Sequence, residues 1–328
     1  MFKRILVPLD GSLRAERALP VAARIARATV GSIVLLRVVS PRIDYGGGFA
    51  PSPLMAEEFT DREFIDETSY LKEVAQSQQL AGIRITSEVE FGLSVEQILG
   101  VVESQKVDLI IMCSHGRTGF SRWVLGSVAQ RLIHNCAVPV LVLREGGEAL
   151  PATRTDTARP LCAVVSLDGS ALAEAALLPA ANLVAALAAP AKGELHITEV
   201  VKLLTAPAEV GASLQAVEQV QKYLEGVQAR LLEQLKALDI TVTYSVTRAA
   251  EIPRGIITAA EQGVESARGG RCDVLAMATH GRGGLERWVM GSVTERVLDG
   301  TKLPVLVVRP PQTKAQREKG MEQTRAAQ

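Results

Sequence analysis

The chain has 328 residues, enough for two domains of ordinary size, and its 47% hydrophobic and 22% charged residues with a mean hydropathy of +0.17 are typical of a soluble globular protein. Its 36 basic and 36 acidic residues cancel, and the isoelectric point is near 6.9. Proteins that bind nucleic acids usually carry a basic excess or a basic stripe, so we expect no nucleic acid partner.

The first part of the chain alternates between strand and helix patterns. Apolar runs without alternation are typical of strands that are covered on both faces of a parallel sheet. The predicted strands are Arg4–Leu9, Ser32–Val39, Arg84–Glu90, Asp108–Cys113 and Val138–Leu143. The predicted helices are Arg14–Ala28, Glu57–Gln79, Val95–Ser104 and Ser127–Cys136. Strands that are joined through helices form right-handed crossovers, so the pattern predicts a doubly wound α/β sheet.

The second part of the chain repeats the first. The segment from Ser114 to Arg144 returns from Thr279 to Arg309 with 16 of 31 positions identical and no gap. ILVPLDGS in the first strand is answered by AVVSLDGS in the second copy. The offset is 158 residues at the start and 165 at the end, so the second copy gained about seven residues. A period of this length indicates duplication of a whole domain.

These patterns predict a first domain over residues 1–144, a linker rich in Gly, Pro and Thr over 145–160, and a second domain over 161–309. Residues 310–328 are polar and are predicted to be disordered. We interpret the apolar stretch Ala171–Ala191 as one alanine-rich helix buried on one side, because a glutamate and two prolines interrupt it. The first strand is too short for a signal peptide, and four scattered cysteines suit a reducing compartment. We therefore expect a cytoplasmic protein with no membrane insertion.

Asp10 and Asp168 follow the first strand of each copy, where open parallel sheets bind ligands. A carboxylate at this place can accept hydrogen bonds from a ribose hydroxyl or an adenine amino group. It can also cap the following turn or helix, as Asp commonly does. Because LDGS is retained in both copies beside a second feature, we favour the ligand role.

That second feature is the loop after the fourth strand. His115-Gly116 is followed, nine residues later, by Gly126-Ser127, and the second copy has the same spacing from His280-Gly281 to Gly291-Ser292. Glycines let backbone N–H groups approach phosphate oxygens closely. A helix that begins at the serine directs its unpaired N–H groups at the same anion. The spacing therefore indicates a phosphate-binding loop in each copy.

The same residues allow other interpretations. Ser127 and Ser292 each start a capping-box pattern, in which the serine hydroxyl serves the helix when no ligand is bound. His115 and His280 invite a general-base role, but the sequence specifies no partner carboxylate or nucleophile nearby, so we interpret them as hydrogen-bonding residues. The chain contains neither GxxxxGK[ST] nor a GxGxxG that opens the first helix. We expect no catalytic residue and no metal site.

ILVPLDGS, the [ST]HGR loop with its nine-residue gap to Gly-Ser, and the terminal PVLVLR strand resemble the universal stress protein family. The resemblance covers Phe2 to Arg309, and hence both copies. It implies two tandem doubly wound domains, each a five-stranded parallel sheet in the order 3-2-1-4-5 with helices on both faces. Strands one and four are neighbours in that order, so Asp10 and the loop after Cys113 flank the point where ligands bind.

The resemblance also implies an ATP site, with or without Mg²⁺. Asp10 would contact the adenosine, Val38 would line the adenine pocket, and the glycine loop with the start of the next helix would cradle the phosphates. The implied positions in the first copy are Pro8, Asp10, Val38, Cys113, His115, Gly116, Gly119, Gly126, Ser127 and Val128. Those in the second copy are Asp168, Val200, Ala278, His280, Gly281, Gly291, Ser292 and Val293.

Both copies depart from the family pattern at the first glycine, and the second copy also has Ser166 in place of Pro8 and Ala250 in place of Gly92. Cys113 and Ala278 stand where ATP-binding members carry the first glycine of G-x-x-G, and a Cβ there is expected to crowd the phosphates or the ribose. We therefore keep three functions open. The first is a non-catalytic, ATP-binding stress-response protein with an unknown protein partner, and the second is a nucleotide-independent interaction scaffold. The third is a slow ATP hydrolase. The chain lacks a Walker lysine, which argues against this third function.

The last strands, Val138–Arg144 and Leu303–Arg309, predict how the two copies assemble. The fifth strand lies at an edge in the order 3-2-1-4-5, and a long apolar edge with unpaired N–H and C=O groups is a liability. We predict that the two strands pair antiparallel across a pseudo-twofold axis, so that one chain mimics the family's usual dimer. A further homodimer of chains remains open.

Overall fold

The computed structural model describes residues 1–40, 53–114, 125–144, 150, 160–203, 210–263, 271–280 and 290–310. The elements of the first half are β1 (Arg4–Leu9), α1 (Leu13–Glu16), α2 (Ala18–Thr29), β2 (Ser32–Val39), α3 (Pro53–Ala75), η1 (Gln78–Leu80), β3 (Arg84–Phe91), α4 (Ser94–Ser104), β4 (Leu109–Cys113), α5 (Ser127–Asn135) and β5 (Val140–Leu143). Those of the second half are β6 (Leu161–Leu167), α6 (Ala171–Glu174), α7 (Leu177–Ala188), β7 (Gly193–Lys202), α8 (Val210–Gln234), β8 (Ile240–Ala249), α9 (Ile252–Gln262), β9 (Val274–Ala278), α10 (Ser292–Gly300) and β10 (Val305–Val308). Nearly all of the predicted linker and tail lies outside the described residues.

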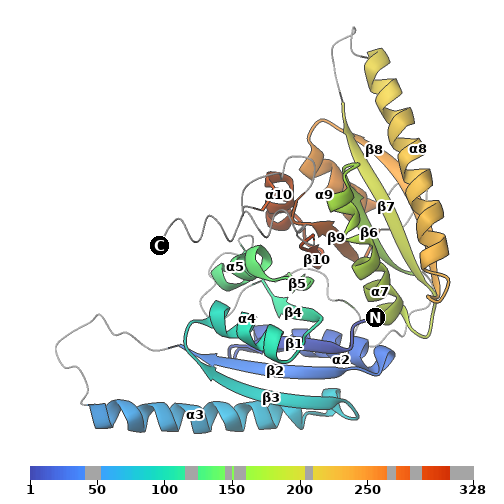
Figure 1. Cartoon of the computed structure of the whole chain (residues 1–328). Coiled ribbons are helices and arrows are strands. Elements are labelled where there is room, and N and C mark those ends of the chain that lie inside the picture. The colour runs from blue at the N-terminus through green and yellow to red at the C-terminus, as the bar shows by residue number, and fades with distance from the viewer. Residues whose placement is uncertain are drawn as a thin grey trace.

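All the strands join in one sheet of ten strands, in the order β3-β2-β1-β4-β5-β10-β9-β6-β7-β8 (Figure 1). Each half therefore has the predicted order 3-2-1-4-5, and its strands are parallel to one another. β1 lies between β2 and β4, and β6 lies between β7 and β9. The strand order reverses at β1 and at β6, so a ligand site is expected at the carboxyl ends of these strands.

β5 and β10 join the two halves. They pair antiparallel, with Val142 opposite Val305 and Val140 opposite Val307. Both strands are buried along their whole length. This pairing confirms the prediction from the edge-strand argument, because it converts two apolar edges into the middle of one sheet.

Hydrogen bonds outside the paired strands add to the junction. The backbone N–H of Met290 donates to His134 Nδ1 at 3.4 Å, and the Arg309 guanidinium donates to the carbonyl of Asn135 at 3.1 Å. On the opposite face α2 packs against α7, where the Arg24 guanidinium donates to the carbonyl of Ala189 at 3.5 Å. The two halves are therefore in contact on both faces of the sheet, in addition to the pairing of β5 with β10.

Helices cover each face of the sheet. One face packs against α2, α3, α7 and α8, and the other packs against α4, α5, α9 and α10. The long helices α3 and α8 lie along the outer strands of the sheet, far from each other (Figure 1). The two-faced cover explains why the inner strands are almost continuously apolar.

The helix after the first strand of each half is broken, contrary to the prediction of a single helix. α1 ends at Glu16 and α2 begins at Ala18, and the second half repeats this break between α6 and α7. Pro20 and Pro179 lie three residues into the second helix of each pair. A proline has no N–H to donate to the carbonyl four residues earlier, and its ring clashes with that carbonyl, so the chain cannot continue one helix through this point.

The buried surface of α7 is wider than the one buried side that was predicted for Ala171–Ala191. α7 is buried around most of its circumference, because its own sheet covers one side and α2 covers another. The segment Ala171–Ala188 is apolar and long enough to cross a membrane, with a mean hydropathy of 1.7, and 56% of it is buried inside the fold. The apolar composition of this segment is explained by the packing of α7 between its own sheet and α2.

A row of polar side chains sets the second half apart. His196 on β7 has Nδ1 2.8 Å from Thr243 Oγ1 and Nε2 2.8 Å from Ser245 Oγ, both on β8. The Thr243 hydroxyl also donates to Glu194 Oε1 at 3.0 Å. Burial lowers the pKa of His196 to about 4, so the imidazole is neutral at pH 7.

This histidine predicts a pH dependence of stability. The free energy of unfolding should fall as the pH is lowered from 6.5 to about 4, because the unfolded chain binds a proton on His196 that the fold excludes. At about 1.4 kcal/mol per pKa unit the loss reaches roughly 3 kcal/mol. Val34 holds the same register position in the first half, so His196→Val is the matched variant. Denaturant unfolding at pH 7 and pH 4 measures both chains, and equal losses in the two would contradict the assignment.

Candidate functional site

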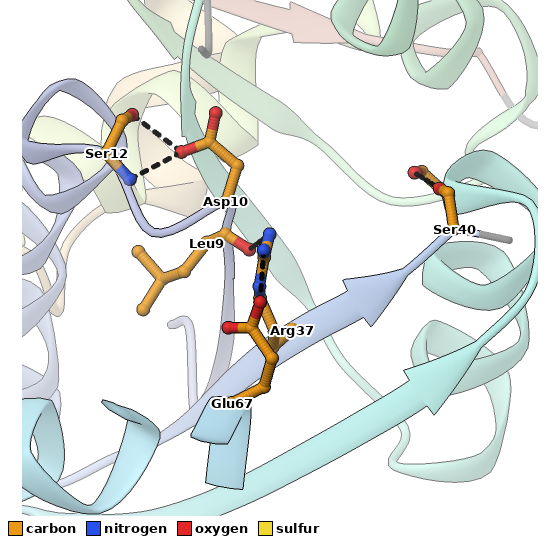
Figure 2. Close-up of polar contacts among 7 residues, drawn as sticks. Leu9, Asp10, Ser12, Arg37, Ser40 and Glu67 are labelled. Atoms are coloured by element: carbon orange, nitrogen blue, oxygen red, sulfur yellow. Dashed lines mark hydrogen bonds and ion pairs between the residues drawn. The ribbon is translucent and has the colours of Figure 1, made fainter. Parts of the chain in front are cut away.

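The turn after β1 is built around Asp10. Its Oδ1 accepts hydrogen bonds from the backbone N–H of Ser12 at 3.0 Å and from the Ser12 hydroxyl at 2.6 Å (Figure 2). The Ser12 hydroxyl in turn accepts from the N–H of Ala15 at 3.2 Å and caps α1. Gly11 has φ +79°, a conformation that favours glycine. The capping role that the sequence left open for this aspartate is therefore present in the structure.

The second half repeats this turn. Asp168 Oδ1 accepts from the N–H and hydroxyl of Ser170 at the same 3.0 and 2.6 Å, and Gly169 has φ +78°. Turn geometry alone thus accounts for the retention of LDGS in both copies. Figure 2 shows the second carboxylate oxygen of Asp10 pointing away from Ser12, which donates to the first oxygen alone.

The sheet register brings Val38 close to Asp10 in the chain's first half. Leu9 at the end of β1 pairs with Arg37 on β2, so the next residues on the two strands, Asp10 and Val38, are neighbours. In the second half Leu167 pairs with Glu199, which places Asp168 beside Val200 in the same way. Each half therefore joins a carboxylate and an apolar side chain at the carboxyl edge of its central strands. Pro8 and its counterpart Ser166 lie one residue before these strand ends.

Arg37 is part of the same region, and the sequence analysis missed it. Its guanidinium is buried, donates to the carbonyl of Leu9 at 3.4 Å, and pairs with Glu67 Oε1 of α3 at 2.6 Å (Figure 2). The sequence feature that could have pointed to this residue is a single arginine within the otherwise apolar run SIVLLRVV. The register position of Arg37 is taken in the second half by Glu199, which is also buried. The two halves thus differ in charge beside the strand-end aspartate.

The departures from the first-glycine position are packed into the fold. The Cys113 thiol at the end of β4 donates to the carbonyl of Arg14 in α1 at 2.8 Å. Ala278 at the end of β9 is buried. The loop ends are held to these strands, because Gly126 donates to the carbonyl of Ser114 at 2.8 Å and Gly291 donates to that of Thr279 at 2.9 Å.

The start of α5 differs from the capping-box prediction. The N-cap residue is Gly126, and no side chain caps the helix, because Ser127 is already its first helical residue. α10 begins in the same way at Gly291 and Ser292. A serine must occupy the N-cap itself for its hydroxyl to reach the first-turn N–H groups, so both serines lie one position too far into the helix. Within the part of the chain that the structure describes, neither helix start has a capping side chain, and an exposed helix start of this kind can bind an anion.

The predicted phosphate loop falls largely outside the described residues. His115, Gly116, Gly119 and Gly281 are among the residues that the structure leaves undescribed. His280 is described, and its Nδ1 lies 2.9 Å from Thr279 Oγ1. Val128 and Val293 are the second helical residues of α5 and α10, and both pack against the core on that face. Among the described residues, no three His, Cys, Asp or Glu side chains form a group that could hold a metal ion.

Comparison with known proteins identifies the family. A model of the universal stress protein family matches residues 1–144 and 163–309. The chain belongs to this family. It is 33% identical over 150 residues to universal stress protein MJ0531 of Methanocaldococcus jannaschii, a match that covers 44% of this chain and 84% of the relative. It is 29% identical over 341 residues to universal stress protein Mb2019 of Mycobacterium bovis, which covers 95% of this chain and 96% of the relative.

A solved structure supports the fold of this universal stress protein over nearly its whole length. A universal stress protein from Archaeoglobus fulgidus aligns with a TM-score of 0.60 at 22% identity, covering 94% of this chain and 97% of that one. A putative universal stress protein from Pseudomonas aeruginosa aligns with a TM-score of 0.58 at 18% identity, covering 94% of both chains. Both confirm the tandem arrangement of two α/β domains that the sequence predicted.

Proposed function

We propose that this universal stress protein binds ATP at the carboxyl edge of its first half and uses the bound nucleotide to change its contacts with a protein partner. One observation carries the proposal: the uncapped amino terminus of α5 follows β4, the strand that neighbours β1 with its Asp10. The first-turn N–H groups supply donors for phosphate oxygens. The Asp10 carboxylate and the Val38 side chain supply an acceptor and an apolar contact for the nucleoside.

The residues of the first half fit a nucleotide better than those of the second. Beside Asp10 the register position is held by the basic residue Arg37, which pairs with Glu67, whereas the same position beside Asp168 is held by the acidic residue Glu199. A triphosphate carries several negative charges, and each like charge held nearby at partial burial lowers its affinity. We therefore propose that the first half has the higher affinity. Mg²⁺ would bind mainly through the phosphate oxygens and its own waters, as it usually does at nucleotide sites.

A nucleotide-independent scaffold is the second proposed function. Cys113 and Ala278 favour it, because a Cβ stands in each half where the ATP-binding pattern has glycine. Under this alternative, water binds the first-turn N–H groups of the two uncapped helices. The protein then contacts its partners without a bound nucleotide. We also propose that any ATP hydrolysis is far slower than the roughly 1–1,000 per second common in enzymes.

Titration calorimetry with ATP separates these functions. We expect Asp10→Ala to lower ATP affinity about tenfold or more, because it removes the acceptor for the nucleoside. Asp168→Ala is a matched control, since it removes the same two hydrogen bonds to a capping serine and should cost the same stability, about 1 kcal/mol. Equal ATP affinity in both variants and the wild type would assign the aspartates to capping alone. Turnover in the common enzyme range would contradict the non-catalytic proposal.

A further inference from the structure

Two buried cysteines meet in the second half. Cys162 is the second residue of β6, and Cys272 lies two residues before β9. Their Sγ atoms are 2.6 Å apart, and both side chains belong to the core on the α9–α10 face of the sheet. The two thiols are therefore in direct contact, within hydrogen-bonding distance of each other. The two sulfur atoms need little movement to form a bond.

Hydrogen bonds fix the backbone on both sides of the pair. The N–H of Asp273 donates to the carbonyl of Cys162 at 2.8 Å, and the N–H of Cys162 donates to Asp273 Oδ2 at 2.9 Å. The N–H of Cys272 donates to the carbonyl of Ala260 in α9 at 2.9 Å. The approach of the two thiols is therefore held by regular structure on three elements, β6, α9 and the residues that lead into β9.

The first half contains the same backbone arrangement without the thiols. Asp108 donates to the carbonyl of Arg4 at 2.9 Å and accepts from its N–H at 3.0 Å, and Val107 donates to the carbonyl of Val102 at 3.0 Å. Arg4 and Val107 thus stand where the second half has Cys162 and Cys272. The fold forms this junction without cysteine, so the thiol pair is an addition confined to the second half.

We propose that Cys162 and Cys272 form a redox site, a dithiol that a peroxide oxidises to a reversible intramolecular disulfide. One thiol loses its proton, and the thiolate attacks a peroxide oxygen; the O–O bond breaks, leaving a sulfenic acid and a hydroxide that takes up the proton as water. The second sulfur then attacks the sulfenic sulfur, the S–O bond breaks, and the departing hydroxide takes the second thiol proton. Two thiols lose two electrons and two protons, and one peroxide becomes two waters.

The environment of the pair sets the rate of this reaction. The hydrogen bond to Cys272 and burial raise the pKa of Cys162 well above its ordinary value. Because the thiolate is the reactive species, oxidation is slow at neutral pH and speeds up as the pH rises. The same burial shields the disulfide from reductants once it has formed.

The disulfide links the two central strands of the second half. β6 and β9 are neighbours, and the bond closes a loop between residues 110 positions apart. Closing a long loop restricts the unfolded chain, so oxidation raises the melting temperature of the second half by several degrees. Asp168 and Ala278 lie at the opposite ends of these strands, so the cross-link stiffens the frame of the second site without touching it.

Peptide mapping after peroxide treatment tests the proposal. Trypsin places the four cysteines on four different peptides, so the pair can be read directly. The folded chain is incubated with hydrogen peroxide at pH 8.5, its remaining thiols are alkylated under denaturing conditions, and the digest is analysed without reductant. We expect one cross-linked species that contains Cys162 and Cys272, has lost two hydrogens, and disappears with dithiothreitol.

Two variants complete the experiment. Cys272→Ser should abolish both the cross-linked peptide and the rise in melting temperature, whereas Cys113→Ser, which leaves the pair intact, should preserve both. Recovery of the Cys162 and Cys272 peptides as separate alkylated thiols or as sulfinic acids would overturn the proposal. A rise in melting temperature that persists in Cys272→Ser would also overturn it, because another oxidation would then cause the change.

Discussion

Replacing Gly126 with valine should lower the ATP affinity of the first half by about 100-fold or more, a loss of roughly 3 kcal/mol. Gly126 is the N-cap of α5 and has φ −62° and ψ 148°, an extended conformation that valine adopts readily. The helix should therefore form as before, while the new side chain occupies the space in front of its first-turn N–H groups. The loss would come from excluding phosphate rather than from unfolding.

Controls separate these two causes. Gly100→Val on α4 adds the same side chain where nothing lies within 4 Å of the new Cβ, and it should leave ATP affinity unchanged. Gly291→Val is the counterpart in the second half, where the new Cβ would lie 3.3 Å from the carbonyl oxygen of Thr279. Titration calorimetry of the three variants gives the comparison. If Gly126→Val together with Gly291→Val bound ATP as tightly as the wild type, the helix starts would not be the phosphate sites.

Replacing Val142 with proline should separate the two halves. Val142 pairs with Val305 on one side and with Met112 on the other, in the middle of the ten-stranded sheet. Proline has no N–H to donate and fixes φ, so an interior strand tolerates it poorly. We expect the β5–β10 pairing to be lost, with aggregation or exchange of halves between chains, because both apolar edges become exposed.

Size-exclusion chromatography with light scattering measures this result against the wild type. Val307→Pro on β10 should have the same effect, because Val307 takes the corresponding place opposite Val140. Val142→Ala keeps the backbone N–H and should lower the melting temperature while leaving the mass of the species unchanged. A Val142→Pro chain of wild-type mass, with unchanged hydrogen-exchange protection of Val305 to Val308, would show that this pairing does not hold the halves together.

The sheet was predictable from the sequence because its strands are short apolar runs. Arg4–Leu9 and Ser32–Val39 match β1 and β2 residue for residue. The pairing of β5 with β10 was predictable too, since an apolar edge strand needs a partner and duplication supplies one. The break between α1 and α2 was missed, although Pro20 marks it in the sequence. Helical spacing of apolar residues continues through the break, so periodicity alone did not reveal it.

The site was predictable only in part. Asp10 and Val38 are neighbours because parallel strands end at one edge, which a strand order can predict. The place of Ser127 within α5 depends on where the first helical hydrogen bond forms, and the capping-box pattern gave the wrong residue. Arg37 and Glu199 hold the same register position in the two halves, beside the last residue of the central strand. This correspondence becomes apparent only when the strand pairings of the two halves are compared. This replacement of a basic residue by an acidic one, which distinguishes the two proposed sites, required the structure.

Native mass spectrometry of the purified chain tests the central claim, that the first half holds an adenine nucleotide, most directly. Ions of the folded chain are recorded as purified and after addition of ATP, with Gly126→Val and Gly100→Val beside the wild type. We predict one tightly bound adenine nucleotide per chain in the wild type and in Gly100→Val, and none in Gly126→Val. A folded wild-type chain that carries no nucleotide even at millimolar ATP, or a nucleotide retained equally by Gly126→Val, would contradict the account.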